Sequence, residues 1–258
     1  MFHLGTGANR LNWSEQDQKV IDPCLADFYA ILKGKKPLHA KLDAEQSKDL
    51  SISNTLSSFF KGDRYSISAK KVLVRIGGVA GYLYGAEVDF DRGFAHVEPE
   101  VVALSHFAFY SSEEIQRMPL SVSQPGPATS KMFHLGTGKT KLKWPQKEQK
   151  MIGACVADSD ALLRGKKPVS ARLNPDKLRE LNNLVSKSEW YAGDNYEIWV
   201  ARTGVVIGGL TGFLYSVRLY FDPDFAQQEL GPVVLSHVAF YSYDEMEKLL
   251  GNKELPGR

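Results

Sequence analysis

Apolar and polar positions along this chain follow one order of patterns, and that order occurs twice. Apolar residues recur near a helical period over 20–32 and again over 151–163, so each segment is expected to form an amphipathic helix. Apolar and polar residues then alternate over 82–90 and 213–221, which is typical of an antiparallel strand with one solvent-facing side. Each half of the chain is therefore predicted to be α+β, with N-terminal helices packed on a C-terminal antiparallel β-meander.

Glycine, proline and capping residues mark the ends of these elements. Gly34 and Gly165 are each followed by two lysines and a proline, which predicts the end of the first helix in each half. Pro23 is expected to kink that helix or delay its start in the N-terminal half. Asn174 predicts the cap of a second helix in the C-terminal half, whereas the corresponding N-terminal segment is rich in serine and is a weaker helix candidate. A Gly-Gly pair at 77–78, and again at 208–209, predicts a turn or a bulge.

The last strand of each half is expected at 101–110 and at 233–241, followed by a short helix. A helix followed by a meander is the element order of cystatin-like and nuclear-transport-factor-like folds. The likeness is one of element order by analogy only, because the chain carries no residue motif of either family.

The repeated pattern comes from a repeated sequence. Residues 1–118 align with residues 132–249 without a gap, at an offset of 131, and 50 positions are identical. A period of this length is that of a whole domain. The prediction is a tandem duplication of one domain of ~130 residues. Its parts are repeat domain 1 at 1–118, a Pro/Ser/Gly linker at 119–131, repeat domain 2 at 132–250 and a C-terminal tail at 251–258.

Composition narrows the class of protein. Hydrophobic residues make up 43% of the chain and charged residues 24%, which is typical of a soluble globular protein. A net charge of +2 predicts no nucleic-acid partner, and no apolar run is long enough to predict a membrane span. The cysteines, Cys24 and Cys155, lie one in each repeat, so a reducing intracellular compartment, cytoplasm or organelle stroma, is favoured. Met1 matches Met132, so Met1 need not be the native start of the protein, and a leader upstream of it could have been removed.

Polar residues that recur in both repeats are the candidates for chemistry. If the chain is an enzyme, its catalytic candidates are His106, His237, Asp63, Asp194, Tyr84 and Tyr215. They would be the polar groups of a pocket between the helix and the curved sheet of each repeat. For each histidine, the competing interpretation is a buried side chain satisfied by its neighbours. Both cysteines fall on the apolar stripe of a predicted helix, where a thiol is usually inert. No metal-ligand spacing or cofactor motif is present, so neither a metal nor a cofactor is expected.

Positions that differ between the repeats are the candidates for an interface. They are Glu87 and Arg218, Asp89 and Tyr220, and Phe28 and Tyr29, the last two replaced by serine and aspartate in the second repeat. Opposite charges at equivalent positions would suit pairing between the two kinds of repeat, within the chain or between chains.

The expected function is that of a non-catalytic, pseudo-dimeric structural or interaction protein. Such a duplicated building block would self-assemble, in a lattice or shell, or bridge partners, so its partner is itself or another protein. The alternative is an enzyme or small-ligand-binding protein with a pocket in each repeat.

Overall fold

The computed structural model describes residues 11, 13–51, 55–96, 102–112, 144–177, 187–229 and 231–250. The N-terminal half contributes α1 (Glu15–Leu32), β1 (Lys41–Asp43), α2 (Ala44–Asp49), β2 (Thr55–Lys61), β3 (Tyr65–Ile76), β4 (Val79–Phe90), β5 (Ala95–His96) and β6 (Ala103–Ser111). The C-terminal half contributes α4 (Gln146–Leu163), β7 (Arg172–Leu173), β8 (Lys187–Gly193), β9 (Tyr196–Ile207), β10 (Leu210–Phe221), β11 (Ala226–Gln227), β12 (Val234–Ser242) and α6 (Tyr243–Leu250). The predicted linker and tail lie outside the described residues.

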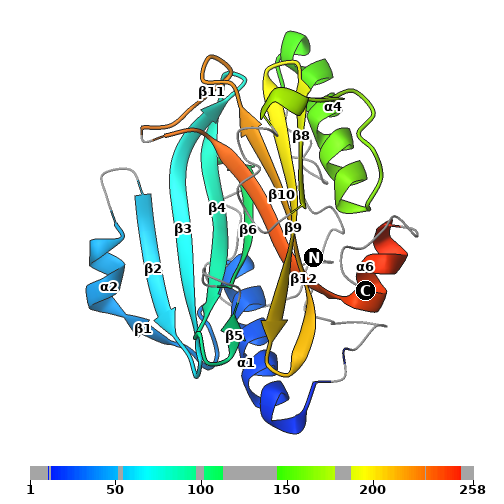
Figure 1. Ribbon diagram of the computed structural model, residues 1–258. Helices are drawn as coiled ribbons and strands as arrows, with labels where there is room; N and C mark the ends of the chain where they lie inside the picture. Colours follow the sequence, from blue (N-terminus) through cyan, green and yellow to red (C-terminus); the bar gives the residue numbers. More distant parts are fainter. Residues whose placement is uncertain are drawn as a thin grey trace.

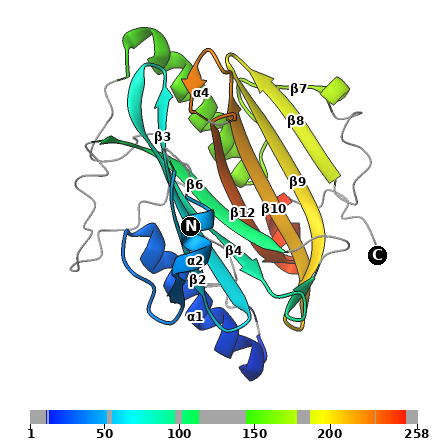
Figure 2. The same cartoon turned by 90° about the vertical axis from the view of Figure 1, so that its left-hand side faces the viewer.

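The strands of both halves join in one antiparallel sheet (Figure 1). Its order is β1-β2-β3-β4-β6-β12-β10-β9-β8-β7, with β5 and β11 attached to β9 and β3. The prediction of a mixed α+β protein with antiparallel strands is confirmed. Among the described residues the helices are few, and α1 and α4 lie at opposite ends of the molecule (Figures 1 and 2). No described helix is long and apolar enough to cross a membrane.

Helix α1 begins at its cap and not at its proline. Ser14 accepts a hydrogen bond from the backbone N–H of Asp17 at 3.1 Å, and the helix runs through Pro23 to Leu32. The expectation that Pro23 delays the start of the helix is therefore wrong. An interior proline costs about 3 kcal/mol, and the cap together with the buried stripe of the helix offsets that cost. The buried residues of this helix are Val20, Ile21, Cys24, Leu25, Asp27, Phe28 and Ile31.

A buried aspartate ties each helix to the chain that follows it. Asp27 accepts hydrogen bonds from the backbone N–H groups of Leu38, His39 and Ala40 at 2.6–2.8 Å, and from the hydroxyl of Tyr65 at 2.8 Å. Asp158 does the same in the C-terminal half, with Val169, Ser170, Ala171 and Tyr196 as donors. Both carboxylates are fully buried, so they hold the fold and do not face a substrate.

The two halves meet at the pair β6–β12, which is three residues long. His106 lies directly opposite His237, with Ser105 opposite Val238 and Phe107 opposite Ser236. The two histidines are 131 residues apart in the sequence. The halves also exchange short strands farther out, where β5 pairs with β9 and β11 pairs with β3.

Each hydrophobic core is built from both halves. The core around α1 includes residues of the C-terminal half, namely Val205, Ile207, Leu214, Val238 and Phe240. The core around α4 includes the N-terminal residues Val74, Ile76, Leu83 and Phe109. Trp13, just before α1, packs on Phe240 with ring centroids 6.0 Å apart, and Trp144, just before α4, packs on Phe109 at 5.9 Å. Each helix therefore packs against the strands of its own half and against several residues of the other half.

Candidate functional site

The two candidate tyrosines face the helices, and each is hydrogen-bonded to the end of a helix. The hydroxyl of Tyr215 donates to the carbonyl oxygen of Leu162 at 2.6 Å, and Tyr84 makes the equivalent hydrogen bond to Ile31. Burial raises the pKa of Tyr84 to about 12 and also raises the pKa of Tyr215. Both phenols therefore stay protonated at neutral pH, which suits hydrogen bonding and not base catalysis.

The two candidate histidines contact each other where β6 pairs with β12. Their Nδ1 atoms are 3.4 Å apart, and the ring planes meet at 84° with centroids 5.7 Å apart. His237 is fully buried and His106 is half-buried. The pair therefore joins the two halves at the centre of the sheet.

Asp63 and Asp194 lie apart from these groups, exposed in the turns before β3 and β9. Asp194 lines an open groove of about 450 Å³ beside the start of α4. Tyr215 lines a different, smaller pocket, and His237 lines neither of these two hollows. In the C-terminal half, the histidine, aspartate and tyrosine predicted from the sequence are therefore not brought into one site.

The cysteines and metal-binding side chains offer no reactive centre within the described residues. Cys24 and Cys155 are fully buried, and burial raises the pKa of both thiols well above the usual value. No group of three or more histidine, cysteine, aspartate and glutamate side chains in this part of the chain is arranged to hold a metal ion.

Four of the interface candidates share one side of the sheet. Glu87 lies opposite Ser105, and Arg218 lies opposite Ser236. The hydroxyls of the two serines are 3.1 Å apart, so both point to the same side. Asp89 and Tyr220 follow Glu87 and Arg218 by two residues on their strands and point the same way. Around these four residues this side, which faces away from Tyr84, Tyr215 and the histidine pair, is here named the open face. Toward the ends of the strands the same side is buried, with Leu83 and Phe109 in the core around α4 and with Leu214 and Phe240 in the core around α1.

The N-terminal part of the open face carries two carboxylates and two lysines. Glu87 and Asp89 stand on β4, Lys70 stands on the neighbouring β3, and Lys61 stands on β2. Burial, together with the nearby carboxylate of Glu87, raises the pKa of Asp89 to about 6 against the opposing effect of Lys70.

The C-terminal part of the open face is cationic and aromatic. The Arg218 guanidinium lies 5.0 Å from the centre of the Trp199 ring, a cation–π contact. Trp190 and Tyr220 stack with centroids 5.4 Å apart. Lys177 lies over Trp190 at 4.7 Å and also pairs with a glutamate on β9. The residues 131 positions earlier are Glu87 for Arg218, Ser68 for Trp199, Phe59 for Trp190 and Asp89 for Tyr220, so the two parts differ in charge and shape.

Phe28 and Tyr29 do not belong to the open face. Phe28 is fully buried in the core around α1, and Tyr29 is half-buried against the same core. The replacement of Phe28 by Ser159 in the second repeat is therefore a change in the core, which the pattern of differences alone did not separate from a change at the surface.

Comparisons of this chain with protein-family models, with curated proteins and with solved structures found no match.

Proposed function

We propose that the chain is a non-catalytic interaction protein, a fused pseudo-dimer that self-associates through its open face. The observation that carries this proposal is the opposite charge of Glu87 and Arg218 at equivalent positions on one sheet face. The offset of 131 residues and the reciprocal pairing of strands support the further proposal that the two halves arose by tandem duplication of one domain.

The position of the two charges favours a second copy of the chain as the partner. Ala86 lies opposite His106 and Val217 lies opposite His237, so Glu87 and Arg218 are each one residue along the strand from the level of the histidine pair. A second copy stacked on the open face, with a two-fold axis parallel to the strands, brings its Arg218 toward Glu87 of the first copy. The Glu87–Arg218 contact then forms twice, as an isologous interface requires.

A small-ligand function is the second candidate. A pocket between α4 and the helix-facing side of the sheet supports it.

Charge reversal tests the interface directly. We expect Glu87→Arg and Arg218→Glu each to weaken self-association by about tenfold or more, because each places like charges together at both copies of the contact. The double variant restores opposite charges and is expected to recover association. Light scattering over a concentration series measures the mass, and Glu247→Arg, an exposed reversal on α6, is the matched control. A parent chain that stays monomeric, or a Glu87→Arg chain of unchanged mass, would remove this role for the open face.

The pH dependence of association gives a separate prediction. The pKa of Asp89 is raised to about 6, so its carboxylate is protonated below that pH and charged above it. A cationic partner surface favours the charged form, so association is expected to tighten as the pH rises from about 5 to about 7.5. Asp89→Asn keeps the shape of the side chain and should remove this step. Sedimentation at both pH values measures it, and an equal step in parent and variant would assign the pH dependence to other groups.

A further inference from the structure

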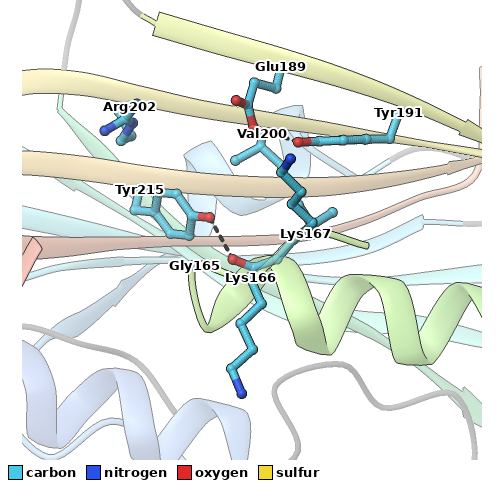
Figure 3. Close-up of a pocket in the computed structure, with 9 residues that line it drawn as sticks. Gly165, Lys166, Lys167, Glu189, Tyr191, Val200, Arg202 and Tyr215 are labelled. Carbon is cyan, nitrogen blue, oxygen red and sulfur yellow. Dashed lines mark hydrogen bonds between the residues drawn. The ribbon is translucent and has the colours of Figure 1, made fainter. Parts of the chain in front are cut away.

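We infer that the C-terminal half carries a binding site for one small oxyanion, of the carboxylate or phosphate class. A pocket of about 70 Å³ lies between the C-terminal end of α4 and the helix-facing side of β8, β9 and β10 (Figure 3). It is lined by Leu162, Gly165, Lys166, Lys167, Glu189, Tyr191, Val200, Arg202 and Tyr215. The volume suits a ligand of a few heavy atoms or a few water molecules.

An unsatisfied arginine donor indicates what the pocket binds. Nη1 of Arg202 is buried, and within the described part of the chain no atom accepts a hydrogen bond from it. A buried guanidinium N–H without an acceptor is costly, and a carboxylate or phosphate oxygen is its strongest partner. Arg202 lies directly opposite Tyr215 in the sheet, so the vacant donor stands beside a tyrosine that lines the pocket.

The two tyrosine hydroxyls that line the pocket already make hydrogen bonds within the chain. The hydroxyl of Tyr191 donates to Glu189 at 2.7 Å, and the hydroxyl of Tyr215 donates to the carbonyl oxygen of Leu162 at 2.6 Å. Figure 3 shows Lys167 extending toward Glu189 and Tyr191, whereas Lys166 points away from them. Lys167 and Arg202 contribute two positive charges to the lining, against the one negative charge of Glu189. The lining therefore favours a negatively charged ligand.

The same place in the N-terminal half has lost these features. Ser58 stands where the C-terminal half has Glu189, Phe60 stands in place of Tyr191, and Lys71 in place of Arg202. The ammonium of Lys71 lies 4.3 Å from the centre of the Tyr82 ring, so this cation already has a partner. One site per chain is therefore expected, although Tyr84 and Tyr215 are conserved between the halves.

Calorimetric titration with sodium acetate, sodium pyruvate and inorganic phosphate, at constant ionic strength, tests the site. We expect at least one of the three to bind saturably with one site per chain. The comparison among them separates carboxylates from phosphate. Arg202→Lys, which installs the residue of the N-terminal half, is expected to weaken binding by about tenfold, because a point charge replaces a planar donor pair. Lys71→Ala is the matched control and should leave the affinity unchanged.

Three outcomes would overturn the inference: no saturable binding of any probe, two sites per chain, or equal affinity in Arg202→Lys. Urea unfolding of the ligand-free variants shows whether a loss of binding reflects a loss of fold. The result does not depend on self-association, because Arg202 lies on the helix-facing side and Glu87 lies on the open face.

Discussion

Replacing Asp27 with asparagine is expected to lower the free energy of unfolding of the whole chain by about 3–5 kcal/mol. The Asp27 carboxylate accepts three backbone N–H groups and the Tyr65 hydroxyl, and it is fully buried. An asparagine offers one acceptor oxygen and places an NH₂ group against N–H donors. At least one backbone donor is then left buried without a partner.

Asp158→Asn should cost as much, because its carboxylate makes the same four hydrogen bonds in the C-terminal half. Asp22→Asn, an exposed position on α1, is the matched control and should change the stability by less than about 0.5 kcal/mol. Urea denaturation followed by circular dichroism measures all three. If Asp27→Asn splits the transition and leaves one part as stable as in the parent, the two halves unfold independently, contrary to the shared cores.

The fold class could be predicted from the sequence because its signals are local. The alternation predicted over 82–90 holds over 86–90, where Ala86, Val88 and Phe90 enter the core around α1, whereas Leu83 is buried on the other side of β4. Gly77 and Gly78, with φ of +51° and +79°, occupy the predicted turn. Asn174 accepts a hydrogen bond from the N–H of Lys177, as a cap would, although most of the predicted helix lies outside the described residues. These features depend on a few neighbouring residues, so a single sequence contains them.

The joining of the halves could not be predicted in the same way. Nothing in Ser105, His106 and Phe107 distinguishes a strand that ends a sheet from one that continues into another, since both need free N–H and C=O groups. The exchange of β5 and β11 depends on pairs of residues more than a hundred positions apart.

The candidate pocket shows a related limit. Recurrence between the repeats selected Tyr84 and Tyr215, which hold the fold in both halves. The residues that distinguish the pocket, Glu189, Tyr191 and Arg202, are those that do not recur. Comparing the repeats for differences on the helix-facing side would have found them, once the side of each position was known.

Separating the halves is expected to have the largest effect. Residues 1–118 produced alone should not form a folded monomer, because Val74, Ile76, Leu83 and Phe109 would lose the core around α4 in which they are buried. Exposing four such side chains costs about 6–12 kcal/mol, as much as the whole stability of an ordinary domain. β6 would also lose its partner strand β12, and β3 would lose its partner strand β11.

Mixing residues 1–118 with residues 132–250 should restore the structure as a one-to-one complex, since every contact between the halves is non-covalent in the described part of the chain. Circular dichroism and light scattering of each half and of the mixture test this. A half alone has one further route to order: two copies of residues 1–118 can pair through Ser105, His106 and Phe107, because these residues already pair with Val238, His237 and Ser236 in the full chain. A dimer of this kind would support the shared cores as strongly as an unfolded half would, because in both cases one half alone does not form a folded monomer. A monomer of either half that unfolds cooperatively is incompatible with these shared cores, because it would need a closed core without the side chains that the other half supplies.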